Sequence, residues 1–359
     1  MMYRDVELRS TAVVSDSGTE TIDLDVLDPI TELVVYLKLT NHTSHNIGKT
    51  PTSIISSIEI VDGGTVYASL SGSAVAAAYF YETGNYPVHG YHEIASWGQD
   101  VYLPLRFGRF LGDPARNLDV ARMRNPQLKV TWAKDTLHAT GTVQLGVRAR
   151  VMTDVAGAGA ALLTKAVRAF TTAGSGVEST ELPTDYPIRR LFIQPWALLT
   201  PPHYVLSRFK MDCDAGKYIP FDLDIYQWLG LTEPEGGFCT VRQRLVITNQ
   251  EYRESWIGRT YGGSATSPST QYMTGCSAAL QSSPLIYANL HDGTPSSDLN
   301  LECTFWGTYP HNVMSLTFGI PDDPATWFPA AAFRKIALDL TQVSASATCT
   351  ILVQQDRPM

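Results

Sequence analysis

The stretch VYLPLRFGRFLGDPARNLDVARMRNPQLKVTW, residues 101–132, carries three short blocks that recur in the same order about 210 residues further along the chain. The three pairs are Leu105–Gly108 with Leu316–Gly319, Asp113–Ala115 with Asp323–Ala325, and Leu128–Trp132 with Ile336–Leu340. Alternation of apolar and polar residues in the third block predicts a strand with one buried face. In the Asp-Pro-Ala block, Asp can cap a helix and Pro suits its first position, so we expect a short helix at each copy.

Two further blocks extend this repeat toward the N-terminus. They pair Asp16–Val26 with Asp214–Ile225, and Leu33–Asn41 with Val241–Asn249, again about 200 to 210 residues apart. Five blocks in one order at a nearly constant spacing are hard to explain by chance. The sequence therefore predicts one fold that occurs twice, in a first domain at residues 1–152 and a second at residues 203–359.

Local patterns around these blocks favour strands joined by turns. Val143 to Val151 alternates between apolar and polar residues, and Thr348–Val353 closes the second half in a similar way. The 27 Gly and 21 Pro residues suit many turns. Strands that are buried on one face and separated by turns build sandwiches, so we predict an all-β protein.

Residues 153–202, between the two domains, form the predicted linker. An apolar stripe at helical spacing predicts a helix over Val155–Phe170. The stripe consists of Leu162, Leu163, Ala166, Val167 and Phe170. We expect an added strand within 186–202, for which the first half has no counterpart. The Ser-, Thr-, Gly- and Pro-rich residues 259–300 predict a long surface loop, matched in the first half by Asn41–Val101.

Composition excludes several classes of protein. The 359 residues carry a net charge of -8, which argues against a basic protein that coats nucleic acid. Only 17% of the residues are charged, which argues against a charged coiled coil. The first residues are too charged for a signal peptide, and no apolar run is long enough to span a membrane. The five cysteines, which never approach a C-x-x-C spacing, indicate neither a zinc site nor a disulfide framework. Folding in a reducing, intracellular compartment fits best. These cysteines are Cys213, Cys239, Cys276, Cys303 and Cys349.

Residues suited to catalysis are scarce. Two H-x-x-H pairs, His42 with His45 and His89 with His92, could belong to a cupin-like metal centre, but polar residues in loops explain them more simply. Two pairs of carboxylates could serve a glycosidase, although exposed positions on strands are the simpler interpretation. These pairs are Asp23 with Asp25 and Asp222 with Asp224. The sequon at Asn41 lacks a secretory signal and is interpreted as incidental. We expect no catalytic residue, metal or cofactor.

Five arginines form the strongest candidate for a functional surface. They are Arg106, Arg109, Arg116, Arg122 and Arg124, interleaved with Phe107 and Phe110. This pattern could describe a nucleic-acid patch. The chain has no basic arm, however, and arginine is favoured where subunits meet. We therefore predict a subunit interface.

The stretch 101–132 resembles a recurring segment of the double jelly-roll major capsid proteins of tailless icosahedral viruses, the tectivirus–adenovirus lineage. The motif covers under a tenth of the chain, whereas the repeat and the length extend the likeness in architecture to nearly all of it. The resemblance implies two tandem eight-stranded jelly rolls with short helices in the loops and the linker. It further implies a homotrimer that forms a pseudo-hexameric capsomer and tiles an icosahedral shell.

The resemblance also implies the partners of such a protein. These would be other copies of the chain, minor capsid proteins, vertex (penton) proteins and, in many relatives, an internal lipid membrane, but no sequence-specific nucleic acid. The chain would be located in the virion and assembled in the host cell cytoplasm. The family has no catalytic residues to carry over.

Two other functions remain open. One is a secreted hydrolase of two jelly rolls that acts on glycoproteins, against which the missing signal peptide argues. The other is an adhesion protein that binds glycans through aromatic surface loops.

Overall fold

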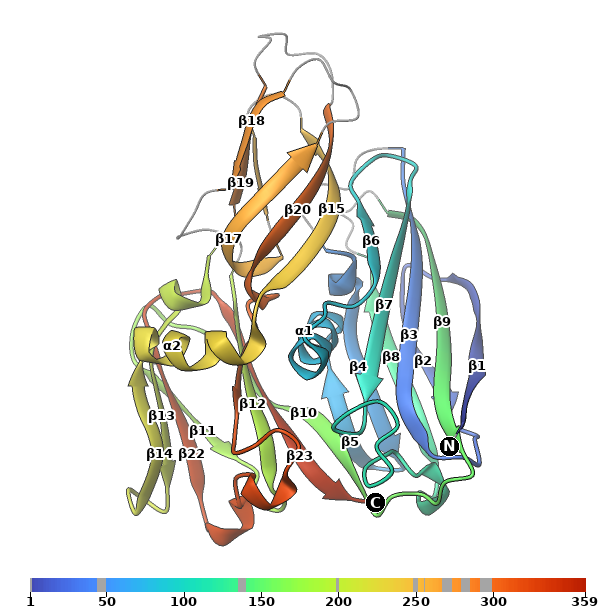
Figure 1. Cartoon of the computed structure of the whole chain (residues 1–359), viewed down its shortest axis with the longest axis vertical. Helices are drawn as coiled ribbons and strands as arrows, with labels where there is room; N and C mark the ends of the chain where they lie inside the picture. Colours follow the sequence, from blue (N-terminus) through green and yellow to red (C-terminus); the bar gives the residue numbers. More distant parts are fainter. Residues whose placement is uncertain are drawn as a thin grey trace.

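The computed structural model describes residues 2–43, 50–134, 140–197, 200–247, 251–254, 256–266, 273–278, 285–290 and 299–359. Most of these residues form strands. The strands make two sandwiches side by side, with a smaller group of strands that rises above them and is called the tower here (Figure 1). The opposite end of the molecule is called the base. The predicted all-β class is confirmed.

The first sandwich consists of one sheet with the strand order β1-β9-β3-β7 and another with the order β2-β8-β4-β5. The bounds are β1 (Met2–Val14), β2 (Ser17–Asp23), β3 (Ile30–Asn41), β4 (Ile55–Asp62), β5 (Thr65–Leu70), β7 (Gly98–Arg106), β8 (Pro126–Ala133) and β9 (Thr140–Thr153). Alternate residues fill the interior, such as Leu33, Val35 and Leu37 on β3 and Leu128 and Val130 on β8. This is the period of two expected for strands with one buried face.

The second sandwich repeats this plan with the orders β10-β23-β12-β21 and β11-β22-β13-β14. The bounds are β10 (Ala160–Thr171), β11 (Val177–Leu182), β12 (Ile188–Trp196), β13 (Leu206–Cys213), β14 (Tyr218–Asp224), β21 (Met314–Thr317), β22 (Ile336–Gln342) and β23 (Thr348–Pro358). Its core includes Phe209, Met211, Leu338 and Ile351, all with no exposed surface.

Strand pairing in the two sandwiches is the same. The antiparallel pairs β1·β9, β3·β9 and β2·β8 correspond to β10·β23, β12·β23 and β11·β22. The ion pair between Arg9 and Glu20 also recurs, as Arg168 with Glu178, and each arginine follows a register shift in its strand. Each sandwich therefore has eight equivalent strands, and the predicted double jelly roll is confirmed.

Three of the five repeat blocks align equivalent elements: β7 with β21, the two Asp-Pro-Ala turns, and β8 with β22. The two N-terminal blocks do not align equivalent elements. The first pairs β2 with β14, whereas the counterpart of β2 is β11. The second pairs β3, whose counterpart is β12, with Val241–Asn249, which begins in β15 (Cys239–Ile247) of the tower. The tower is inserted between β14 and β21. Counterparts before this insertion are about 160 residues apart and those after it about 210, so one constant spacing could not hold.

The predicted helix over Val155–Phe170 is also wrong. Most of this segment is β10, which pairs with β23 from Ala160 to Thr171. Leu162 and Leu163 are buried as strand residues, because pairing with a distant strand overrides a local helical pattern. Since β10, β11 and β12 complete the second jelly roll, we propose that this domain begins near residue 160 and that 153–202 is not a linker.

One α-helix follows the fifth strand of each jelly roll. The helix α1 (Gly72–Thr83) begins where the Ser71 hydroxyl accepts a hydrogen bond from the backbone N–H of Ala74 at 3.2 Å. The helix α2 (Ile225–Gly236) begins with a capping box, in which the Asp224 carboxylate accepts from the backbone and the Gln227 side chain returns a contact. These caps satisfy backbone N–H groups that the first helical turn leaves free.

Short 3-10 helices complete the connections. They are η1 (Pro51–Ile54), η2 (Val120–Arg122), η3 (Pro202–Tyr204), η4 (Pro324–Thr326) and η5 (Ala330–Ala332). The short helix predicted at Asp323 is therefore a single 3-10 turn. At Asp113 the chain forms turns instead, although the carboxylate accepts from the backbone N–H of Ala115 at 2.9 Å as a cap would.

The tower, together with the strand β6 that joins it to β7, contains seven described strands. They are β6 (His89–His92), β15, β16 (Glu251–Glu254), β17 (Ile257–Thr266), β18 (Met273–Ala278), β19 (Leu285–Leu290) and β20 (Leu299–Pro310). The loop predicted for 259–300 is wrong for these strand residues, and 267–272, 279–284 and 291–298 lie outside the described part. The matching loop predicted for Asn41–Val101 is likewise wrong where it forms β4, β5 and α1.

Two parallel contacts make the sheets continuous, one between the two jelly rolls and one between the first jelly roll and the tower. Ser69 on β5 pairs with Lys165 on β10, and Tyr91 on β6 pairs with Gln243 on β15. Both chain ends lie away from the tower (Figure 1). No helix among the described residues is long and apolar enough to cross a membrane.

Candidate assembly surface and jelly-roll junction

The five arginines predicted to contact another subunit follow one path, from the end of β7 through the loop that leads to β8. They are Arg106, Arg109, Arg116, Arg122 and Arg124. The first four make ion pairs inside the chain, and the last two are exposed. A single chain does not test the interface, which stays a prediction.

Arg106 connects α1 to the outward face of the β1-β9-β3-β7 sheet. Its Nε lies 3.0 Å from a carboxylate oxygen of Glu32. Its guanidinium lies 4.9 Å from the ring centre of Tyr79 on α1, within the range of a cation–π contact. Arg150 also approaches Glu32, at 3.6 Å. One largely buried carboxylate thus holds two cations on this face.

Arg109 fixes the Asp-Pro-Ala turn. Its Nε and Nη2 donate to the two carboxylate oxygens of Asp113 at 2.6 and 2.9 Å. Burial alone would raise the pKa of Asp113, but hydrogen bonds from Arg109 and from backbone amides lower that pKa overall. Arg109 also donates to the carbonyl of Asp322 at 2.9 Å, so this turn reaches the second jelly roll.

Arg116 links the two jelly rolls through a bidentate ion pair. Its Nε and Nη2 donate to the carboxylate of Asp356, on β23, at 2.9 and 2.7 Å. The guanidinium also lies 5.1 Å from the ring centre of Trp327. The two charged side chains are only 13% and 15% exposed. Bidentate hydrogen bonds between an arginine and a carboxylate are among the stronger polar contacts in proteins.

Arg122 and Arg124 remain accessible at the base. The Nε of Arg122 lies 3.0 Å from Asp119, yet half of the arginine side chain is exposed. The backbone N–H of Arg124 donates to Asp62 at 3.1 Å, while the residue itself is exposed. These are the two members of the cluster best placed to meet another molecule.

A buried network at the junction was not anticipated from the sequence. Arg189 Nη1 donates to Gln354 Oε1 at 2.9 Å, and Gln354 Nε2 donates to Glu82 at 2.6 Å and to Thr164 at 3.3 Å. Burial raises the pKa of Glu82, although Arg189 and the hydrogen bond from Gln354 oppose this. Burial, together with Arg189, lowers the pKa of neighbouring Arg190 to about 10. The pair Arg189-Arg190 inside an otherwise apolar strand was the available signal.

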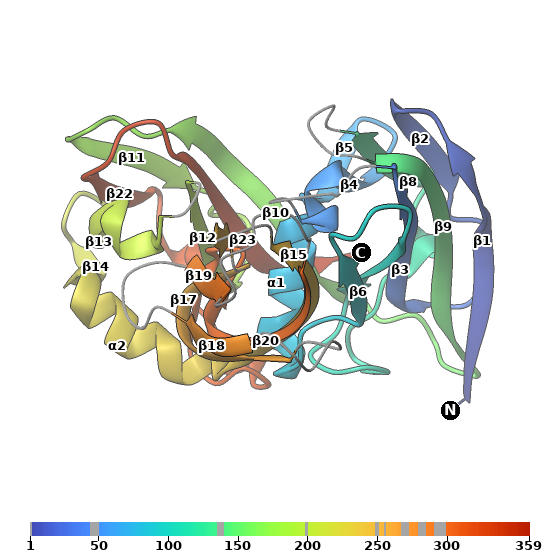
Figure 2. The ribbon, with the colours of Figure 1, turned by 90° about the horizontal axis from the view of Figure 1, so that it is seen from above.

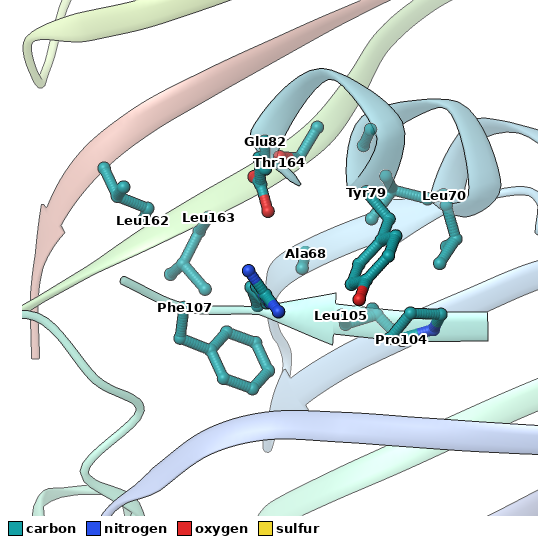
Figure 3. Close-up of a pocket in the computed structure, with 13 residues that line it drawn as sticks. Ala68, Leu70, Tyr79, Glu82, Pro104, Leu105, Phe107, Leu162, Leu163 and Thr164 are labelled. Carbon is teal, nitrogen blue, oxygen red and sulfur yellow. The ribbon is translucent and has the colours of Figure 1, made fainter. Parts of the chain in front are cut away.

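A small cavity of about 20 Å³ lies beside this network, between α1, β7 and β10 (Figure 3). Apolar side chains such as Phe107 and Leu163 line it, and the carboxylate of Glu82 points into it. This volume suits about one water molecule and is far below the roughly 300 Å³ of a ligand pocket. The cavity is therefore not a substrate site.

The described members of the two histidine pairs do not converge on a metal site. The ring nitrogens of His89 lie 2.8 and 3.0 Å from the carbonyl oxygens of Pro87 and Arg242, and burial lowers its pKa. His92 packs its ring against Trp97. His45 lies outside the described residues. Within the described part of the chain, no three His, Cys, Asp or Glu side chains are grouped as metal ligands.

The paired aspartates have structural contacts. Asp222 forms a two-pronged ion pair with Arg208 at 2.7 and 2.9 Å, and Asp224 caps α2. Asp23 accepts a hydrogen bond from Gln127 across neighbouring strands at 2.8 Å. The exposed carboxylates of Asp23, Asp222 and Asp224 therefore have hydrogen-bonding partners within the chain.

The sequon asparagine is buried inside the chain. Asn41 is 3% exposed, and its amide nitrogen donates to the carbonyls of His92 and Ile94 at 2.8 Å. Its amide oxygen accepts from Gln99 at 2.7 Å. A glycan on this nitrogen would replace these contacts. The cysteines with described side chains are all buried: Cys213, Cys239, Cys303 and Cys349.

The comparisons with known proteins agree on the fold. No protein-family model and no curated protein matches the sequence. The structure is similar to the major capsid protein of STIV, the Sulfolobus Turreted Icosahedral Virus, with a TM-score of 0.64 and 10% identity over 100% of this chain and 97% of that one. It is similar to the major capsid protein of bacteriophage PM2 (TM-score 0.56, 11% identity, 100% and 98% covered). A chain of the PBCV-1 virus capsid gives 0.56 and 11%, with 99% and 93% covered. This chain therefore has the double jelly-roll fold of viral major capsid proteins.

Proposed function

We propose that the chain is a major capsid protein that assembles as a homotrimer, forms a pseudo-hexameric capsomer and tiles an icosahedral shell. The observation that carries this proposal is the likeness to viral major capsid proteins over the full length of this chain and nearly all of theirs. The internal repeat supports it, because three chains with two equivalent jelly rolls each supply six similar modules for a six-sided tile.

The rigid link between the jelly rolls also supports a tiling role. A tile must hold its two modules at a fixed angle so that neighbouring copies meet in register. The bidentate pair of Arg116 with Asp356 and the buried contact of Gln354 with Glu82 supply such a link. In this proposal the chain has no catalytic role and requires no cofactor.

Location and partners follow from the same proposal. The chain would reside in the virion shell after assembly in the host cell cytoplasm. Its partners would be other capsomers, minor capsid and vertex (penton) proteins, and an internal lipid membrane if the virus has one. Arg122 and Arg124 are exposed at the base, where a minor capsid protein could bind them.

Native mass spectrometry of the purified chain tests the proposal. We expect a trimer, and electron microscopy of concentrated protein should reveal six-sided particles or sheets. A chain that stays monomeric at all concentrations would refute the assembly. Hydrolysis of a glycoprotein, or binding to a glycan array by the isolated monomer, would instead support the enzyme or the adhesion protein.

A further inference from the structure

The two jelly rolls of one chain meet through unlike surfaces. The first contributes α1, and the second contributes the outward face of the β10-β23-β12-β21 sheet (Figure 2). Tyr81 on α1 donates to the carbonyl of Val313 at 2.7 Å, and its ring centre lies 6.1 Å from that of Phe192 on β12. Gln354 on β23 donates to Glu82 on α1 at 2.6 Å. A helix of one module is thus packed on a sheet of the other.

The same junction joins two strand edges. β5 ends a sheet of the first jelly roll, β10 begins a sheet of the second, and a parallel bridge between Ser69 and Lys165 connects them. In the repeat, β14 is the counterpart of β5, and β1 is the counterpart of β10. Both β14 and β1 are terminal strands of their sheets, and they lie on opposite flanks (Figure 2). One flank therefore ends in β14, which corresponds to β5, and the other ends in β1, which corresponds to β10. These are the counterparts of the two strands that pair at the junction.

The helix beside β14 has an exposed outer surface. α1 and α2 both have 12 residues and are followed by a glycine. Counted from their N-caps, Tyr226 takes the place of Ser73, and Glu235 takes the place of Glu82. Tyr226 is 76% exposed and Leu231 is 46% exposed. Large exposed apolar side chains on a helix are typical of a surface that binds a partner.

The outward face of the β1-β9-β3-β7 sheet is the counterpart of the sheet face that covers α1. The strand register places Arg150 where the second jelly roll has Gln354. At the junction, Gln354 contacts Glu82. The equivalent contact between two copies would bring the cation of Arg150 to the anion of Glu235, so the charges on the two flanks are complementary.

This sheet face also contains a groove of about 210 Å³. Its lining includes Val34, Tyr36, Tyr102, Gly146 and Arg148. At the junction, Ser73 lies 3.4 Å from Gln194, whose counterpart in the first jelly roll is Tyr36. Since Tyr226 replaces Ser73, its side chain would reach this groove.

We propose that α2 and β14 of one copy dock on the outward β1-β9-β3-β7 face of a second copy, with Tyr226 in the groove and β1 beside β14. This inference rests on the proposed capsid function and identifies the surfaces through which its subunits bind. The contact is head-to-tail, because the α2 and β14 flank of each copy binds the β1 flank of the next. Both flanks of every copy are occupied only when the copies close into a ring. The partner is a second copy of this chain.

Paired cysteines test the strand contact. In the register of Ser69 with Lys165, Asp222 of one copy faces Val6 of the next. The variant Val6→Cys/Asp222→Cys carries these positions on opposite flanks, so its new disulfides can form only between chains. We expect ladders of linked chains on a non-reducing gel, collapsing to one band with a reductant. Each single-cysteine variant, as a control, should give no ladder beyond that of the wild type.

A substitution in the helix tests the groove contact. Because Tyr226 is mostly exposed, Tyr226→Ala should leave the thermal unfolding of the monomer unchanged. It should raise the concentration at which half of the chains are assembled by about tenfold or more, as expected for an interface aromatic. Leu27→Ala is the matched control, because Leu27 is 89% exposed but lies in the loop between β2 and β3 at the base. The control should assemble like the wild type.

The outcomes separate this inference from the proposed function. Trimers that form without the specific cross-link, and that are insensitive to Tyr226→Ala, would overturn the docking surface and leave the capsid role intact. A wild-type chain that never assembles would overturn both. Specific cross-linking together with weakened assembly of Tyr226→Ala would support the contact.

Discussion

Removing the guanidinium of Arg116 should destabilise the whole chain by about 3 kcal/mol. Breaking a buried ion pair by deleting one partner costs about 3–5 kcal/mol, because the other charge stays buried without a partner. The lower value applies here, since the side chains of Arg116 and Asp356 retain 13% and 15% exposure. Loss of the cation–π contact with Trp327 accounts for about 0.5–1 kcal/mol of this cost.

A double-mutant cycle in urea measures this pair directly. We expect Arg116→Ala and Asp356→Ala each to lower the free energy of unfolding, and the double variant to lose about 2 kcal/mol less than the sum of the two. Arg208 with Asp222 is the matched control, because it has the same bidentate geometry at 2.7 and 2.9 Å on an exposed surface. Its coupling should fall within the error of the measurement. A coupling for Arg116 with Asp356 no larger than that of the control would refute the reasoning.

Three further predictions concern single side chains. The buried Glu82 has a raised pKa in the folded state, so its ionisation opposes folding as the pH rises above about 4. The stability of Glu82→Gln relative to the wild type should therefore increase with pH, as measured by urea unfolding from pH 4 to 8. A difference in stability that stays constant over this range would contradict the prediction. Asp224→Ala should cost about 1–2 kcal/mol, because it removes the capping box of α2, and calorimetry should find a lower melting temperature. A Cβ at Gly157 would lie 1.7 Å from a carboxylate oxygen of Asp119, so Gly157→Ala should destabilise by about 1–3 kcal/mol, whereas Gly159→Ala, with nothing within 4 Å, should be nearly neutral; equal melting temperatures would contradict this.

The repeat was recognisable in the sequence only after the tower insertion. The blocks around Leu105 and Leu128 align true counterparts, because β7 with β21 and β8 with β22 both follow the insertion. Before it, the true counterparts include Arg9 and Arg168, which pair with Glu20 and Glu178. These counterparts are about 160 residues apart, so a spacing near 210 residues aligns unrelated strands in this part of the chain.

The arginine cluster illustrates the limit of reading a surface from composition. Arginine-rich segments are common where proteins bind partners, and this one was predicted to contact another subunit. In the folded chain, Arg116 pairs with Asp356 near the C-terminus, and the contact with another subunit stays a prediction. Nothing local to Arg116 indicates that partner, because the two residues become neighbours only when the second jelly roll docks on the first.

By itself, the sequence determined the all-β class, the strands with clear alternation and the presence of two similar modules, because alternation and turn residues act over a few neighbouring positions. The tertiary structure decided the rest. It made Val155–Phe170 mostly a strand, because hydrogen bonds to β23, contributed from almost 190 residues away, outweigh a local helical pattern. It also decided which charged side chains pair within the chain, and that β1 and β14 are the terminal strands of their sheets at the two flanks.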